Sequence, residues 1–325
     1  MLRLFLQPGP FAMFALPVFL GVLCVSALLP ESSPSLIVAG WSPFSAFVGW
    51  ADGLQALGLL VSGGLLLVQA YFVNFLVERH RLLPRFSYLP AFVFLLIGGS
   101  FQSTIWPTSA GLAHLFLLGA FHSLLQLANA TRVLPLVFNY GFLIALGAFF
   151  YPPILAFFPL IFVGLTYFRS FQLREWLVAM VGLLLPFVYL WIGYGYLAQG
   201  QTLWMPLGFS TSLLQVVGGL TPSEWGFLVV VGIAFALSLQ PFIRLIGVNK
   251  VRMRRSLELL IWSLGAALLS QWIAPGASHQ LLLLMSFPLS IFFANYALHA
   301  RRVWIGELIF GVWVILCIYH QATGQ

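Results

Sequence analysis

The stretch GLQALGLLVSGGLLLVQAYFVNFLVERHRLLPR, residues 53–85, decides the fold class. Residues 53–76 are mostly apolar and carry no charge, and about 20 such residues at ~1.5 Å each cross a bilayer as a helix. Three arginines, Arg79, Arg81 and Arg85, follow this run. An apolar span that ends in a basic loop is typical of a membrane helix whose end faces the cytoplasm.

The composition of the whole chain agrees with this interpretation. Of the 325 residues, 61% are hydrophobic and 6% are charged, whereas a soluble domain carries roughly 25% charged residues. Such a chain has too few charges to cover a soluble fold. Its net charge of +7 comes from scattered cations that form no basic stripe, so we expect no nucleic-acid partner. Two cysteines give neither a disulfide framework nor a cysteine-based metal site, and we expect no metal and no cofactor.

The chain contains eleven apolar runs that are candidate spans. Charges and Pro or Gly residues separate one run from the next. The runs cover residues 11–29, 53–76, 88–104, 111–128, 135–150, 153–168, 176–197, 225–246, 257–273, 279–298 and 303–319. The sequence therefore predicts an all-α fold, a polytopic transmembrane helical bundle of about 11 spans. Because no soluble segment is long enough to fold separately, residues 1–325 are predicted to form a single integral-membrane domain.

The orientation follows from the positions of the cations. All 14 Lys and Arg residues lie before the first run, in every second loop after it or, for Arg244, at the end of a run that leads into such a loop, and the alternate loops and the C-terminal tail contain none. The positive-inside rule then predicts that the N-terminus is cytoplasmic and the C-terminus is on the outer side. One cytoplasmic loop is strongly basic, with Lys250, Arg252, Arg254 and Arg255. We expect these cations to lie on anionic headgroups of membrane lipids, at about 1 kcal/mol each.

Two outward loops are long enough to contain structure, and we expect a short interfacial helix in each. In the first, Ser42-Pro43 is a helix-start signal that predicts a helix over residues 43–51. Trp41 and Trp50 flank that helix and suit the headgroup region, so they are candidate lipid-binding residues. In the second, the apolar stretch 207–220 is predicted to lie on or dip into the membrane.

Two acids of the first outward loop are candidate catalytic residues. Glu31 follows the C-terminal end of the first span, where the helix dipole disfavours a negative charge, in a loop without a cation. Asp52 stands at the start of the second span, where the same dipole gives a carboxylate a structural role. Carboxylates at such positions act as a base in proton or glycosyl transfer, or simply cap a helix or face water.

The fourth span carries a polar stripe of candidate binding residues. His114, His122 and Gln126, with Asn129 beyond them, are spaced by eight, four and three residues and share roughly one helical face. The stripe serves a proton path, a metal pair or a headgroup contact, or else ordinary hydrogen bonds between helices. The two histidines are about 12 Å apart along the helix, which is too far for one metal ion.

Three segments together resemble a known family. They are NFLVERHRLLPRFSYLP (74–90), FNYGFLIALGAFFYPP (138–153) and RSFQLREWLVAMVGLLLPF (169–187). They resemble an uncharacterised family of polytopic inner-membrane proteins of Bacteroidota, a domain of unknown function, and the resemblance covers roughly residues 70–190. It implies a multi-pass protein of the inner membrane of a Gram-negative cell envelope, and it transfers no active site.

Three hypotheses of function remain open. The first is a non-catalytic subunit or scaffold of an envelope complex, with other envelope proteins as partners. The second is an envelope lipid or glycan enzyme that resembles the polyprenyl-phosphate-dependent glycosyltransferases, with Glu31 or Asp52 as the base. Against it, a phosphate leaving group needs cationic or metal stabilisation, and the outward loops contain no Lys or Arg. The third is a facilitator-type transporter for a lipid or a small hydrophobic solute, with the polar stripe along its path.

Overall fold

The computed structural model describes residues 5, 9–27, 55–100, 105, 108–169, 172–197, 222–248, 251–273, 278–299 and 303–323. This part of the chain contains helices and no strand, which confirms the all-α prediction for it. Eleven α-helices follow one another: α2 (Pro10–Ala27), α4 (Gln55–Arg79), α5 (Leu89–Gly98), α7 (Ser109–Gln126), α8 (Leu134–Phe150), α9 (Leu160–Phe168), α10 (Leu173–Leu197), α12 (Pro222–Val248), α13 (Val251–Ile273), α14 (Ser278–His299) and α15 (Val303–Thr323). Two 3₁₀ helices accompany them, η2 (Leu127–Asn129) and η3 (Pro152–Phe157).

Each of the eleven predicted apolar runs overlaps one of these α-helices. Five described helices, those within α4, α7, α10, α12 and α14, are long and apolar enough to cross a membrane by length and composition. The chain therefore has the character of a membrane protein. The number of spans and their orientation stay predictions.

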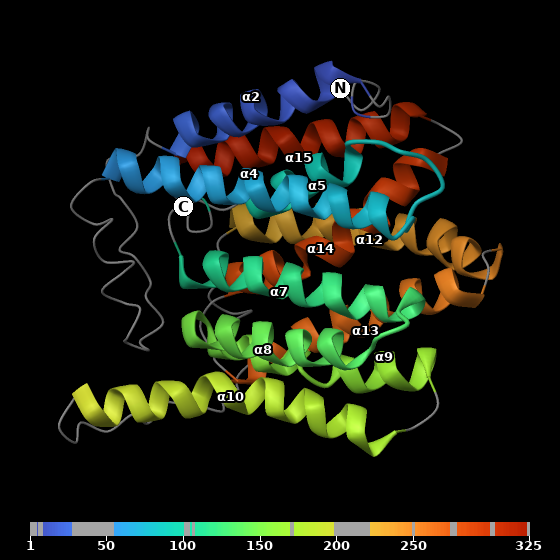
Figure 1. Cartoon of the computed structure of the whole chain (residues 1–325). Coiled ribbons are helices and arrows are strands. Elements are labelled where there is room, and N and C mark those ends of the chain that lie inside the picture. Colours follow the sequence, from blue (N-terminus) through green and yellow to red (C-terminus); the bar gives the residue numbers. More distant parts are fainter. Residues whose placement is uncertain are drawn as a thin grey trace.

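The helices lie side by side, from α2 and α15 at one edge of the bundle to α10 at the other (Figure 1). The centre is formed by α5, of which every residue is buried, and by α14, which packs against α5, α12 and α13. Aromatic rings fill the space between these helices. Phe242 stacks on Phe292 at a centroid distance of 3.7 Å, and Phe121 meets Phe287 at 4.9 Å.

Several serine side chains inside this core form hydrogen bonds with their own helix. The hydroxyls of Ser263 and Ser270 each donate to the carbonyl three residues earlier, both at 2.6 Å, and Ser290 does the same at 2.7 Å. A buried hydroxyl that bonds back to its own helix needs no partner on another helix and no water. These serines therefore fit an apolar core without forming a polar site.

Three of the larger differences between the predicted runs and the helices have a clear physical reason. The run predicted over 88–104 forms a helix only to Gly98, because the chain turns at Gly98-Gly99 and the Gly99 N–H closes the last turn on the Leu95 carbonyl at 2.8 Å. The run predicted over 153–168 is broken by Pro159 into η3 and α9. The Tyr140 hydroxyl donates to the Phe157 carbonyl at 2.6 Å and so satisfies a carbonyl at this break.

The third difference concerns the predicted basic loop. The helix expected to begin at residue 257 begins at Val251, so Arg252, Arg254 and Arg255 belong to the first turns of α13 and do not form a loop. Cations at a helix N-terminus are disfavoured by the helix dipole. Glu258, one turn later, compensates, because its carboxylate accepts a hydrogen bond from Arg254 Nε at 2.8 Å.

Helices α8 and α10 pack backbone against backbone at two glycines. A Cβ atom on Gly141 would collide with the backbone carbonyl of Ala179, and one on Gly182 would collide with the carbonyl of Phe138. Small residues at such a crossing let two backbones pack directly, which is a common way to associate helices in membranes. The crossing therefore fixes α10 to the bundle through α8.

Candidate functional site

A buried polar pair joins α4 and α7 in the core. The side chains of Gln69 and His114 are both fully buried, and His114 Nδ1 lies 3.2 Å from Gln69 Oε1. Gln69 Nε2 also donates to the Gly111 carbonyl at 2.7 Å. With the glutamine oriented in this way, Nδ1 of His114 carries the proton and donates it. The other ring nitrogen, Nε2, has no partner among the described residues.

A second polar cluster lies where α4 ends, next to the last turns of α7. His80 Nε2 is 3.3 Å from His122 Nδ1, and Gln126 Nε2 is 2.8 Å from His122 Nε2. One arrangement of protons satisfies both contacts: Gln126 donates to His122 Nε2, and His122 Nδ1–H donates to His80 Nε2. Burial, followed by the neighbouring His122 and Arg79, lowers the pKa of His80 to about 4. His80 is thus neutral at physiological pH and able to accept this bond.

The polar stripe predicted on the fourth span is therefore paired within the bundle. His114 contacts α4 in the core, whereas His122 and Gln126 are partly buried near the end of α7. His80 is a partner of the stripe that the sequence pattern does not reveal. The charge pattern puts the ends of the second and fourth spans on the same side, but it does not tell which helices are neighbours.

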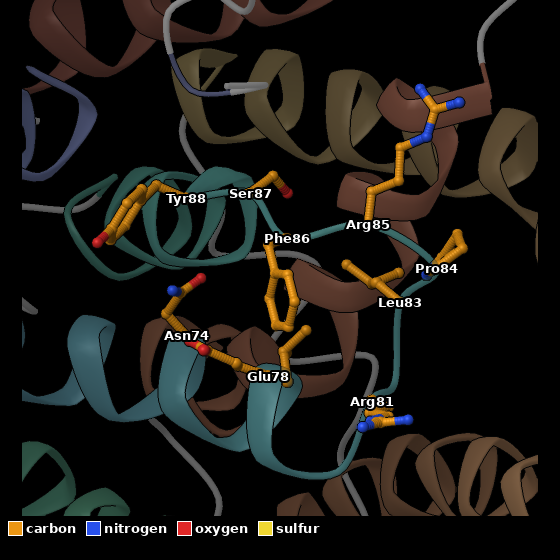
Figure 2. Close-up of a pocket in the computed structure, with 10 residues that line it drawn as sticks. Asn74, Glu78, Arg81, Leu83, Pro84, Arg85, Phe86, Ser87 and Tyr88 are labelled. Atoms are coloured by element: carbon orange, nitrogen blue, oxygen red, sulfur yellow. The ribbon is translucent and has the colours of Figure 1, made fainter. Parts of the chain in front are cut away.

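A cavity of about 530 Å³ opens between the end of α4 and the loop that leads to α5 (Figure 2). Its lining comes from residues 74–88 and includes the charged side chains of Glu78, Arg81 and Arg85. The backbone shape comes from the end of α4, where Arg81 has a positive φ of 51°. The N–H of Arg81 donates to the Glu78 carbonyl at 3.2 Å, and that of Leu82 to the Val77 carbonyl at 3.0 Å. This is a Schellman helix end with arginine in the position that usually holds glycine.

The other candidate residues are only partly visible. The structure describes neither the candidate catalytic acids, nor the two candidate tryptophans, nor the first cation of the basic segment: Glu31, Asp52, Trp41, Trp50 and Lys250. The predicted interfacial helix 43–51 and the stretch 207–220 also lie outside the described residues. Arg254 is paired with Glu258, and Arg255 donates a hydrogen bond to the Tyr167 carbonyl on α9.

Among the described residues, no three His, Cys, Asp or Glu side chains are grouped closely enough to hold a metal ion. Glu175, at the start of α10, is buried and lies 3.9 Å from the Arg169 guanidinium. Arg169 in turn donates to the Ala130 carbonyl at 3.0 Å. These charges connect chain segments at one end of the bundle and do not form a cluster of free carboxylates.

The comparisons with known proteins give one match. The model of a family of unknown function (DUF6427) matches residues 52–323. No curated protein and no solved structure matches the chain.

Proposed function

Since the chain belongs to the family of unknown function DUF6427, we propose its role from its own architecture: it is a multi-pass protein of a bacterial inner membrane that acts as a non-catalytic subunit or scaffold of an envelope complex. The whole chain forms one integral-membrane domain with eleven spans, a cytoplasmic N-terminus and an outer C-terminus. The protein belongs to the cell envelope of a bacterium of the Bacteroidota.

Contacts between helix ends support this orientation. His80 at the end of α4 meets His122 near the end of α7, and Arg169 after α9 bonds to Ala130 after η2. Arg255 at the start of α13 bonds to Tyr167 at the end of α9. Each contact joins ends that the positive-inside rule places on the cytoplasmic side. In Figure 1 these ends lie at the right of the bundle.

Helix α10 carries the subunit proposal. Only 17% of the apolar stretch of α10 is buried inside the bundle, compared with 72% of the corresponding stretch of α14. Helix α10 is held to the bundle through α8. Its inner face consists of Ala179, Gly182 and Pro186, whereas the opposite face exposes large side chains such as Leu184 and Val188. A rigidly attached helix with a broad apolar outer face is suited to pack against a helix of another subunit within the membrane.

A photo-cross-linking experiment tests this proposal. With a photoreactive phenylalanine analogue at Val188, we expect one discrete adduct in intact membranes, because a partner helix covers this face of α10. Mass spectrometry should identify the same protein after extraction of the intact complex in a mild detergent. The matched control is the same analogue at Phe14, an exposed apolar position on α2, which should give no such adduct. If neither position gives a protein adduct, α10 faces lipid and the subunit proposal fails.

The two alternatives stay hypotheses. The glycosyltransferase-like enzyme depends on Glu31 and Asp52, which lie outside the described residues. The facilitator depends on the polar stripe, whose side chains are engaged in hydrogen bonds with α4, with the turn after it and with each other. Neither alternative has a described observation that favours it over the subunit.

A further inference from the structure

We propose that the cavity between the end of α4 and the loop to α5 binds the headgroup of a membrane lipid that carries both a phosphate and a primary ammonium group. This lipid site is independent of the subunit role proposed above. It rests on a buried hydroxyl, on the charges around the cavity and on the position of the cavity at a helix end.

The buried hydroxyl is that of Ser87. This residue lines the cavity, is only 7% exposed, and its Oγ has no hydrogen-bond partner among the described residues. Ser263 and Ser270 in the core differ, because they bond back to their own helix, whereas the buried Ser109 Oγ on α7 also has no partner among the described residues. Buried polar groups are almost always hydrogen-bonded, so this hydroxyl lacks an acceptor. Its Oγ is itself shielded from solvent, so a rotation about χ1 is needed to turn it toward the cavity. A phosphate oxygen of a bound headgroup is such an acceptor.

The charges around the cavity specify the headgroup further. Arg81 and Arg85 line the cavity, and neither forms an ion pair with a described residue. Figure 2 shows their side chains on opposite sides of the loop, extending away from each other. Their long side chains give charge-assisted hydrogen bonds to a phosphate. Glu78 and Asn74 line the same cavity from α4, one helical turn apart. A carboxylate beside an anionic headgroup costs free energy, whereas it pairs with an ammonium group.

The position of the cavity suits a lipid. Val77 and Leu83 form buried apolar parts of its wall, while Phe86 is 59% exposed beside them. An exposed aromatic ring next to charged groups is typical of the membrane interface, where acyl chains begin. Simple anchoring of arginines on anionic lipids needs only their charge, and it leaves the Ser87 hydroxyl without an acceptor.

Thermal unfolding of the purified full-length protein in mild detergent tests the site. Added phosphatidylethanolamine should raise Tm by about 4 °C at ~100-fold excess over its Kd, and phosphatidylglycerol and phosphatidylcholine should raise it by less than half of that. Inorganic phosphate alone should give no shift. An equal shift with phosphate would identify a free-anion site, and a larger shift with phosphatidylglycerol would identify an anionic-lipid site; either result overturns the proposal.

Variants separate the site from general effects of charge. Arg81→Gly removes the guanidinium but suits the positive φ, so the protein should fold, and combined with Arg85→Gln it should abolish the lipid shift. Glu78→Gln should make the Tm shifts produced by phosphatidylethanolamine and phosphatidylglycerol equal. Ser87→Ala should keep or raise the lipid-free Tm and at least halve the phosphatidylethanolamine shift. The control Arg244→Gln, an exposed cation on α12, should change nothing. A full shift in Ser87→Ala or in the double arginine variant contradicts the site.

Discussion

Leucine in place of Gly182 is expected to detach α10 from α8 and to leave the protein largely misfolded in the membrane. A Cβ atom at this position would collide with the Phe138 carbonyl and lie 3.2 Å from both the carbonyl carbon and the Cα of the same residue. Backbone atoms cannot rotate away as a side chain can, so the two helices must separate. The free energy of unfolding should fall by about 3 kcal/mol, the upper end of the range for overpacked cores. Gly141→Leu should behave in the same way, since its Cβ would meet the Ala179 carbonyl and the Leu183 nitrogen at 2.9 Å.

The same helix supplies a matched control. Gly193 also lies on α10, but a Cβ atom there has open space within 4 Å. Gly193→Ala should therefore be neutral or slightly stabilising, because alanine has the higher helix propensity. Folded yield after detergent extraction and Tm measure all three variants. If Gly182→Leu unfolds at the same temperature as the native protein, the close crossing of α8 and α10 does not exist.

Replacement of Gln69 by leucine is expected to give the second large loss of stability. The side chain links His114 Nδ1 and the Gly111 carbonyl inside the core, at 3.2 and 2.7 Å. Its removal leaves the ring N–H of a fully buried histidine without an acceptor. A buried polar group left unsatisfied costs about 1–3 kcal/mol, and the shape of the site changes as well. We therefore expect Gln69→Leu to lower the free energy of unfolding by about 2–3 kcal/mol.

A double-mutant cycle distinguishes pairing from simple loss of volume. Gln69→Leu combined with His114→Phe removes both polar groups and retains an aromatic ring opposite Phe94, which lies 5.5 Å from the His114 ring. The double variant should be more stable than Gln69→Leu alone, with a coupling of at least about 1 kcal/mol. Strictly additive losses would show that the two side chains do not depend on each other.

The helices were predictable from the sequence because a long apolar run in a membrane must satisfy its backbone hydrogen bonds within itself, as a helix does. Each predicted run overlaps an α-helix, and the stripe of His114, His122 and Gln126 does share one helix. The boundaries were less predictable. Hydropathy marks where apolar residues stop, while backbone hydrogen bonds continue into polar residues, as they do at Arg252 to Arg255 in α13.

The candidate sites depend on contacts between distant segments, which sequence spacing does not encode. His80 follows the second predicted run and meets His122 across 42 positions, and Gln69 meets His114 across 45. The cavity at the end of α4 is different, since its described lining comes from one continuous segment, residues 74–88. That segment belongs to the first stretch quoted for the family resemblance, yet its shape depends on Arg81 in a backbone conformation that usually indicates glycine.

The most direct test of the proposed membrane orientation uses alkaline phosphatase fused at two places. The enzyme folds to an active form only outside the cytoplasm, so it reports the side of the membrane on which each fusion point lies. Fused after Gln325 it should be active, and inserted after Asn249, before α13 begins, it should be inactive, with both fusions present in the membrane at similar levels. The reverse pattern, an inactive C-terminal fusion and an active fusion after Asn249, would contradict a chain with all of its cations on the cytoplasmic side.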